Sequence, residues 1–503
     1  MSARSAPRAA VAQPWPICSA MPRGPWSRAG MLTRRCRVPA SSASSAPPLR
    51  RRARVHEAGA MSGHSTSLHH PSRSDAAERP AMNTRALPSQ HTDLLFVYLA
   101  YALRYLYLLI LTPFYGRVLG VEGYAQVLAA MSLMNMVWLF VSWGFVAAGG
   151  REIATAPRSG YGGIFWQHVS ARALLSTLAL GGGIVATLAS PILASHPVIG
   201  VCAVLLGIVS AYNLGWYFTA SERPRHTVKL EVLGFVLSLI PILSLVRAPG
   251  DAWVVLACLL VSGVLALALA HWWVRHEISP ARFSPAAGLA LVRSSSTLFV
   301  YTCSSTLLVA SSTYLLSLLS SGSEVGSFGA AERLVSVGLS VMGPASQIFV
   351  PRITALFLHD EGAAFRMVRK AALLLGGIGL AGLVASLLLG HWVVRLIFGA
   401  GFEASVPVLH LLAIVFPLAA INQIIGAYVL VPQHREGLLT RVTLIGAGLS
   451  LLCAIPAGLA WGALGMAAAR VGGELAVAAM LLLTSWRMGI LQRLLDPESE
   501  KTP

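Results

Sequence analysis

The sequence predicts an all-α, polytopic membrane protein of about twelve transmembrane helices, and three observations carry that prediction. The first is composition: the chain has 503 residues, 55% of them hydrophobic and only 12% charged, with a mean hydropathy of +0.67. Soluble domains carry about 25% charged residues, so a soluble core cannot hide this much apolar surface. The other two observations are the lengths of the apolar segments and the placement of basic residues between them.

Twelve segments are apolar over about twenty residues or more, the helix length that crosses roughly 30 Å of hydrocarbon. In chain order they lie near 93–115, 122–147, 169–190, 197–220, 227–247, 251–274, 293–318, 325–350, 370–390, 404–431, 437–457 and 461–486.

The basic residues between these segments predict the orientation of the chain. With the amino terminus inside, fifteen Lys or Arg residues fall in inner loops and three in outer loops, as the positive-inside rule requires. Both termini are therefore expected in the cytoplasm. The inner residues are Arg151, Arg158, Arg172, Arg223, Arg225, Lys229, Arg275, Arg282, Arg293, Arg352, Arg366, Arg369, Lys370, Arg435 and Arg441, and the outer ones are Arg117, Arg247 and Arg395.

Residues 1–90 are predicted to be a disordered basic tail. The formal net charge of the chain is +18, but residues 1–92 alone hold fourteen Lys or Arg against three acidic residues. This Arg-, Ser-, Ala- and Pro-rich segment cannot bury enough apolar surface to fold. It is either a tail or an over-extended start, with Met82 as an alternative start, and a transit peptide is the other interpretation. No basic face is interleaved with aromatic residues, so nucleic acid is not expected as a partner.

Patterns of catalysis and of metal binding are missing from the sequence. It contains no HExxH, GxSxG or P-loop motif, and no CxxC or Cys/His ligand spacing among its six cysteines. The expected outer loops are about a dozen residues or fewer, too short to build a site for an external substrate. We therefore expect neither an enzyme nor a bound metal or cofactor.

The two halves of the chain contain similar sequence patterns at corresponding positions. LGVEGYAQV (119–127) opens the second segment as SGSEVGSFGAA (321–331) opens the eighth, and NLGWYFTASERPRH (213–226) ends the fourth as NQIIGAYVLVPQHRE (422–436) ends the tenth. Parallel repeats predict two six-helix bundles, residues 91–276 and 277–503, related by an axis along the membrane normal. The aromatic triplet followed by Arg223 and Arg225 is typical of an interfacial belt at the cytoplasmic end of a helix.

The stretch GWYFTASER (215–223) resembles the signature that ends the fourth helix of Wzx-type polysaccharide flippases. These belong to the polysaccharide-transport branch of the multidrug/oligosaccharidyl-lipid/polysaccharide (MOP) exporter superfamily. Further similarities occur in the family's order, over about residues 93–490. Two departures are Ala125, where the family often has Gly, and Thr219-Ala220, where Gln-Gly is frequent. The similar stretches are PFYGRVLGVEGYAQV (113–127), GSFGAAERL (326–334), IFVPRIT (348–354), LIFGAGFEASVPVLHLLA (396–413) and GALGMAAARVGGE (462–474).

This resemblance implies two six-helix bundles around a central, cationic cavity in the bacterial inner membrane. It also implies transport by alternating access, in which undecaprenyl-diphosphate-linked oligosaccharide units pass from the cytoplasmic to the periplasmic leaflet. Such units serve the synthesis of O-antigen lipopolysaccharide, capsule or exopolysaccharide. The implied partners are the lipid-linked oligosaccharide, membrane lipids, and polymerase or glycosyltransferase machinery.

Polar residues at membrane depth are costly and need a role or a partner. In the first segment Tyr98, Tyr101, Tyr105 and Thr112 share one helical face, bordered by Arg104. In the seventh, Tyr301 stands in a stripe of Ser and Thr, and in the eighth Arg333, Ser336, Ser340 and Gln347 align, with a kink expected at Pro344. The stripes predict helices that line one wet cavity; the alternative is that they hold helices together.

Arginine residues at membrane depth indicate the charge of the transported substrate. Arg104 has no acid nearby on its own helix, so either a substrate diphosphate or a carboxylate such as Glu474 or Glu332 must compensate it. Arg470 and Glu474, four residues apart, can pair with each other as a structural or coupling pair. If Arg104 and Arg333 face the cavity, it favours an amphiphilic anion, because guanidinium groups bind phosphate oxygens in a bidentate way. Without an ATP-binding motif, coupling to protons or sodium is the hypothesis for energy.

Other functions remain open at this point. A multidrug or lipid II flippase of the same superfamily is the nearest alternative. A membrane glycosyl polymerase or ligase would also have many spans, but should carry a long, charged outer loop. A non-transporting scaffold is the last alternative, against which the polar stripes argue.

Overall fold

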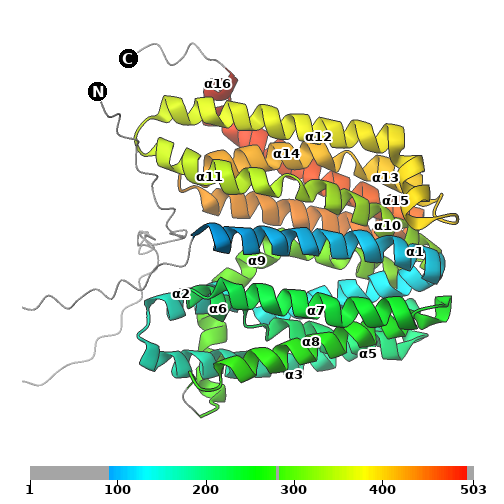
Figure 1. Cartoon of the computed structure of the whole chain (residues 1–503). Coiled ribbons are helices and arrows are strands. Elements are labelled where there is room, and N and C mark those ends of the chain that lie inside the picture. The colour runs from blue at the N-terminus through cyan, green and yellow to red at the C-terminus, as the bar shows by residue number, and fades with distance from the viewer. Residues whose placement is uncertain (1–89, 279–281, 496–503) are drawn as a thin grey trace, which may run out of the picture. The chain divides into compact units, whose positions relative to one another are not determined.

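A computed structural model describes residues 90–278 and 282–495, and within these ranges it contains helices and turns but no strand. This confirms the predicted all-α class (Figure 1). The predicted tail at residues 1–90 lies outside the described residues, apart from Gln90. The longer helices are α1 (Gln90–Ser142), α2 (Phe145–Thr155), α3 (Tyr161–Ala189), α5 (Pro197–Ala211), α7 (Pro224–Leu245), α8 (Ala252–Val274), α9 (Pro285–Leu319), α10 (Gly322–Ser340), α11 (Gly343–Phe357), α12 (Glu361–Phe398), α13 (Ser405–Leu412), α14 (Val415–Ile425) and α15 (Glu436–Arg487).

Short elements complete the chain. They are α4 (Pro191–Ala194), α6 (Gly215–Ala220), α16 (Ile490–Leu495), the 3₁₀ turns η1 (Arg158–Gly160) and η2 (Pro249–Asp251), and a π-helical turn η3 (Gly426–Leu430).

In the described part of the chain, nine helices are long and apolar enough to cross a membrane. Two of these helices contain a turn at a glycine. Gly120 in α1 has φ 66° and Gly462 in α15 has φ 54°, a backbone region that residues with a side chain rarely adopt. Figure 1 shows α1 running to one end of the molecule and returning after this turn. The glycines fall where the sequence predicts one span to end and the next to begin, while the total of twelve spans stays a prediction.

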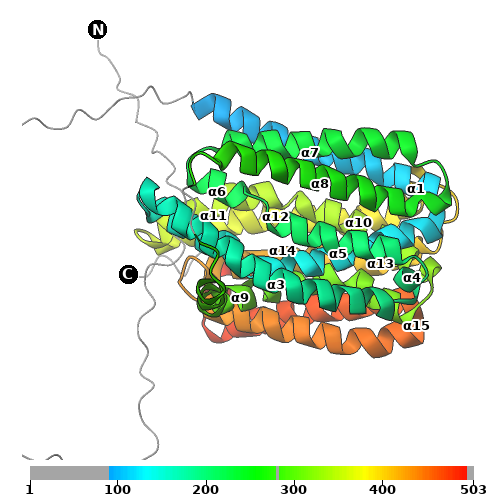
Figure 2. The same cartoon turned by 90° about the horizontal axis from the view of Figure 1, so that it is seen from below.

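The helices form two groups with α1 and α9 between them (Figures 1 and 2). The first group is α2 to α8 and the second is α10 to α15. Helix α1 packs against α5, α7 and α8 of the first group and against α10 and α12 of the second, while α9 packs against α3 and α15. This arrangement agrees with two bundles; the boundary expected near residues 276 and 277 stays a prediction.

Close contacts join each group to α1 or α9 at the end where α1 turns. A Cβ atom at Gly326 of α10 would lie 2.6 Å from the carbonyl oxygen of Val121, so only glycine permits this approach. The Tyr314 hydroxyl of α9 donates to the carbonyl oxygen of Ala186 at 2.7 Å, and the Ser190 and Ser317 hydroxyls lie 2.9 Å apart. These contacts hold α10 against α1 and α9 against the end of α3.

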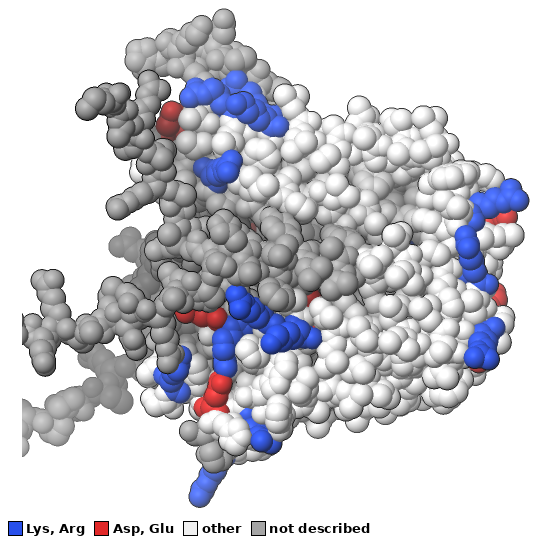
Figure 3. Space-filling view, viewed as in Figure 1, with Lys and Arg blue, Asp and Glu red and all other residues white. Residues whose placement is uncertain are grey.

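Tryptophan and charged residues mark both ends of the helices. Trp253, Trp392 and Trp461 are 49–70% exposed near the end where α1 turns, and Trp272 and Trp486 are exposed near the other end. Figure 3 shows Lys and Arg at these two ends, mostly at the end where α1 begins, with a wide uncharged zone between them. Exposed Trp at both borders of an apolar zone is the pattern of a membrane-embedded surface.

The aromatic triplet Trp216, Tyr217 and Phe218 does not form the interfacial belt that the sequence suggested. Helix α5 ends at Ala211, and the triplet lies on the separate helix α6, where the three side chains are at most 7% exposed. The rings pack with Phe165 of α3 and Ala270 of α8 in one hydrophobic cluster. The break after α5 turns the rings inward, so they join α3, α6 and α8 instead of facing lipid.

Arg223, which follows the triplet, binds Glu277 after α8 in a bidentate pair. Its Nη1 and Nη2 atoms donate to Oε1 and Oε2, each at 2.6 Å, and the Tyr217 hydroxyl donates to Oε2 at 3.3 Å. The hydrogen bonds from Arg223 lower the pKa of the Glu277 carboxyl below its usual 4.5. The sequence motif therefore ties the end of α6 to the end of α8.

Acid should weaken this tie. Because the pKa of Glu277 is lower in the folded state, the contribution of the pair to the free energy of unfolding is full above pH 4.5 and is lost as the pH falls through the lowered pKa. The side chains are 30% and 40% exposed, so the effect is less than about 1 kcal/mol. When melting temperatures of purified protein are measured from pH 7 to pH 3, the Glu277→Gln variant should show a smaller fall in melting temperature with acid than the wild type. The same fall in melting temperature in the variant and the wild type would contradict a stabilising role of the Arg223–Glu277 pair.

Candidate functional site

A cavity of about 330 Å³ lies between the two helix groups, and we call it the central cavity. Both halves of α1 line it, together with α8, α9 and α10. Its polar lining residues are Tyr107, Thr112, Tyr115, Tyr124, Ser132, Asn135, Thr313, Glu332, Arg333 and Ser336. The cavity thus combines a cation, hydroxyl groups and aromatic rings.

Arg333 is the cation of the central cavity, and no described residue pairs with it. It is half-buried and lines the cavity, and it makes no hydrogen bond or ion pair within residues 90–278 and 282–495. Its neighbour Glu332 points elsewhere: Oε1 accepts from Nη1 of Arg470 at 2.5 Å, and Oε2 accepts from the Thr313 hydroxyl at 3.0 Å. Because Glu332 and Arg470 neutralise each other, Arg333 gives the cavity a net positive charge.

Arg470 and Glu474 do not pair with each other in the structure, although their spacing permits it. Arg470 is 5% exposed and turns to Glu332 on α10, which leaves Glu474 to accept a hydrogen bond from Nδ2 of Asn422 at 2.9 Å. Among the described residues Glu474 has no cationic partner. Glu332, considered above as a partner for Arg104, is already bound by Arg470.

Most of the expected tyrosine stripe cannot be placed. Tyr98, Tyr101, Arg104 and Tyr105 belong to the backbone of α1, and Tyr301 to that of α9, but their side chains lie outside the described part. Their roles stay predictions.

The expected stripe on the eighth segment is divided between two helices. Helix α10 ends at Ser340 and α11 begins at Gly343 with Pro344 in its first turn, so the chain breaks where a kink was expected. Arg333 and Ser336 of α10 line the central cavity. Gln347 is exposed on α11 and lines none of the described cavities.

Tyr107, Tyr115 and Tyr124 line the central cavity but were not among the residues expected from sequence. Tyr115 is 5% exposed, and its hydroxyl has no partner in the described part of the chain. Tyr115 lies three residues after Thr112, so extending the predicted face of the first segment by one turn would have found it.

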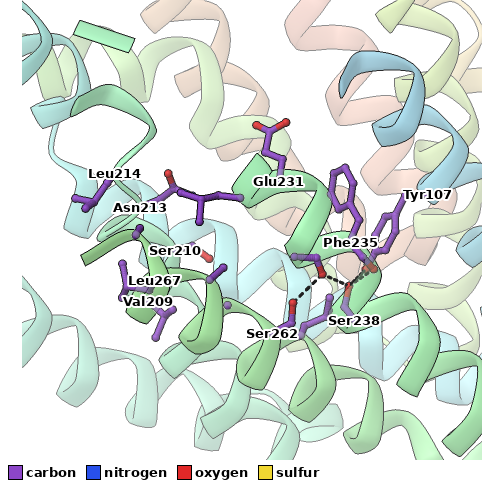
Figure 4. Close-up of a pocket in the computed structure, with 16 residues that line it drawn as sticks. Tyr107, Val209, Ser210, Asn213, Leu214, Glu231, Phe235, Ser238, Ser262 and Leu267 are labelled. Atoms are coloured by element: carbon purple, nitrogen blue, oxygen red, sulfur yellow. Dashed lines mark hydrogen bonds between the residues drawn. The ribbon is translucent and has the colours of Figure 1, made fainter. Parts of the chain in front are cut away.

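A second cavity of about 280 Å³ lies inside the first helix group, and we call it the N-bundle cavity. Helices α1, α5, α7 and α8 line it. The Tyr107 hydroxyl lies 2.9 Å from Oγ of Ser238, and the Tyr107 ring stacks on Phe235 with centroids 4.8 Å apart. Figure 4 shows this stack beside the hydrogen bonds of Ser238 and Ser262. Tyr107 and Leu259 line both cavities, so the two cavities are adjacent there.

Two curated relatives resemble the chain over most of its length. A "Putative O-antigen transporter" of Shigella dysenteriae is 23% identical over 380 residues, which is 74% of this chain and 94% of the relative. A protein of the same name from Escherichia coli K12 is 23% identical over 414 residues, 80% of this chain and 98% of the relative. Both relatives are transporters by name, in agreement with the expectation that the chain is not an enzyme.

Solved structures share the fold. The lipid II flippase MurJ in an inward closed conformation has a TM-score of 0.63 at 12% identity, covering 80% of this chain and 90% of that one. An inward-facing multidrug resistance MATE transporter of the MOP superfamily has a TM-score of 0.54 at 15% identity, covering 77% and 98%. The pattern of the family described as "Polysaccharide biosynthesis protein" matches residues 92–357, more than half of the chain. The chain therefore belongs to the polysaccharide biosynthesis protein family, as its sequence motifs indicated.

Proposed function

We propose that this protein flips undecaprenyl-diphosphate-linked oligosaccharide units from the cytoplasmic to the periplasmic leaflet by alternating access. The units would serve the synthesis of O-antigen, capsule or exopolysaccharide. The observation that carries the proposal is the Arg333 guanidinium, which lines a cavity between two helix groups and has no partner in the described ranges. The names of the two curated relatives support the substrate class.

A diphosphate headgroup suits the chemistry of the central cavity. A guanidinium group binds phosphate oxygens through two parallel hydrogen bonds. The buried Tyr115 hydroxyl, which has no described partner, offers a further donor. A cationic drug would be repelled by Arg333, because Glu332, the carboxylate among the described lining residues, is already neutralised by Arg470. The polyprenyl tail would stay in the bilayer.

Glu474 is our candidate for energy coupling to protons or sodium. A carboxylate at membrane depth needs compensation, and the described partner of Glu474 is an uncharged amide. A bound cation would supply the missing charge. One positive charge moving inward through a potential of 100 mV releases about 2.3 kcal/mol, which can help to drive the headgroup outward.

We propose that the end where α1 begins and α16 ends faces the cytoplasm of a bacterial inner membrane. Lys and Arg gather at this end (Figure 3), as the positive-inside rule expects. Both termini would then be cytoplasmic. The close contacts around Gly326 lie at the opposite end, so the structure would be closed towards the periplasm.

Deletion of the gene tests this function. In a deletion strain, undecaprenyl-diphosphate-linked sugar units should accumulate on the cytoplasmic face, and polymerase and ligase would receive no substrate. Surface polysaccharide should return with the wild-type gene. Lipid II is the second candidate substrate because MurJ shares the fold. Accumulation of lipid II with normal surface polysaccharide would overturn the proposal in favour of that substrate.

A further inference from the structure

We propose that the N-bundle cavity is a subsite for the sugar residues of a lipid-linked glycan whose diphosphate lies at Arg333. This inference rests on the proposed function and adds where the glycan binds. The subsite chemistry is that of an uncharged pyranose: apolar and aromatic walls with a few hydrogen-bonding groups. Three features of the cavity support it, namely the lining residues that it shares with the central cavity, its unused polar groups, and an aromatic stack in a lining without Arg333.

The N-bundle cavity adjoins the central cavity at Tyr107 and Leu259 and lies towards the end of the helices where α1 begins. Its lining reaches from Tyr107 and Ser238 to Asn213 and Ala270, which lie near the ends of α5 and α8. The central cavity continues the other way, past Tyr115. A ligand anchored at Arg333 would enter the first helix group past the Tyr107 side chain, which lines both cavities.

Uncommitted polar groups lie at the far end of the N-bundle cavity. Ser238 and Ser262 are occupied, since both hydroxyls donate to the carbonyl oxygen of Gly234, at 2.8 and 2.7 Å. By contrast, the Ser210 hydroxyl has no hydrogen-bond partner in the described part of the chain. Asn213 accepts from the Gly215 amide through Oδ1 at 2.7 Å, which leaves Nδ2 to donate elsewhere. Sugar hydroxyls can bind at these two positions.

The cation lies in only one of the two cavities. Arg333 lines the central cavity and not the N-bundle cavity, whose lining includes the stacked rings of Tyr107 and Phe235 (Figure 4). Aromatic walls and uncharged hydrogen-bonding groups suit sugar residues, whereas a diphosphate is bound by a guanidinium group. The diphosphate is therefore directed to Arg333 and the uncharged sugars to the side of Tyr107 and Phe235.

Filling the N-bundle cavity should change which glycans are transported. A Cβ atom at Gly234 would meet only Oγ of Ser262, at 3.9 Å, so Gly234→Leu adds volume to the cavity without a backbone clash. The matched control is Gly182→Leu, because Gly182 is an exposed helical glycine of α3 with nothing within 4 Å of its Cβ position. Both substitutions replace glycine by leucine inside a helix.

The experiment measures transport by the full chain in proteoliposomes, with undecaprenyl diphosphate carrying either one sugar or a complete oligosaccharide. Gly234→Leu should slow transport of the oligosaccharide form by roughly tenfold, a loss of about 1.4 kcal/mol, and leave the one-sugar form near the wild-type rate. Gly182→Leu should transport both forms normally. A melting temperature for each variant verifies that it is folded.

A second variant removes donors without adding volume. Ser210→Ala combined with Asn213→Ala should give the same selective loss of the oligosaccharide form. Equal loss of both forms in folded variants, as expected if the polyprenyl tail occupied the cavity, would overturn the subsite alone, as would no loss at all. A wild-type protein that transports neither form would overturn the proposed function and the subsite with it.

Discussion

Replacing Arg333 by alanine should abolish transport while the protein still inserts and folds. Arg333 has no ion-pair partner in the described ranges, so its loss breaks no internal contact there and removes the cation of the central cavity. A charge-assisted hydrogen bond contributes about 1.5–3 kcal/mol, so a bidentate phosphate contact predicts a loss of roughly 100-fold or more in rate. Complementation of the deletion strain and rates in proteoliposomes measure this.

Two further variants make the Arg333 result specific. Arg333→Lys keeps the charge but loses the planar fork, and should retain intermediate activity. Arg441→Ala removes an exposed arginine near the start of α15, outside the described cavities, and should transport normally. Normal complementation by Arg333→Ala would remove this residue from the substrate site.

Glu332→Ala should be the most destabilising of the substitutions considered. It leaves the Arg470 guanidinium, only 5% exposed, without its carboxylate. Breaking a buried ion pair by removing one partner costs about 3–5 kcal/mol. The pair joins α10 to α15, so its loss should also loosen the second helix group. Thermal unfolding of the purified protein measures the effect.

A double variant and a variant of an exposed ion pair serve as controls for the loss of stability in Glu332→Ala. Glu332→Leu combined with Arg470→Leu removes both charges and should recover most of the lost stability, because no unpaired charge then remains. Glu361→Ala breaks the exposed pair with Arg493, whose side chains are 53% and 59% exposed, and should cost less than about 1 kcal/mol. If Glu332→Ala melted like Glu361→Ala, the pair would have no structural importance.

The membrane helices could be predicted because their signal is long and local. Apolar segments of about twenty residues specify where helices cross a membrane. The turn at Gly120 falls between two predicted spans, and the turn at Gly462 falls at the start of the last one. The aromatic triplet at residues 216–218 shows the limit of this method. Its composition suited an interfacial belt, but burial depends on how α6 packs against α3 and α8, which the local sequence does not contain.

Side-chain partners could not be predicted for the same reason. Spacing alone offered Glu474 to Arg470, whereas the partner that the structure provides, Glu332, is 138 residues away in the chain. Arg333 could be selected from sequence because an arginine at membrane depth is costly wherever it lies. Tyr107 lies off the predicted face of the first segment, and its link to Ser238 requires α7 beside α1.

Exposure of the glycan in sealed proteoliposomes tests the central claim most directly. Undecaprenyl-diphosphate oligosaccharide is incorporated with or without the protein, and an impermeant glycosidase added outside digests only the glycans that face it. With wild-type protein, glycans from the inner leaflet should become digestible over time, whereas with Arg333→Ala they should stay protected. An equally protected fraction with wild-type protein and with empty vesicles would contradict the account.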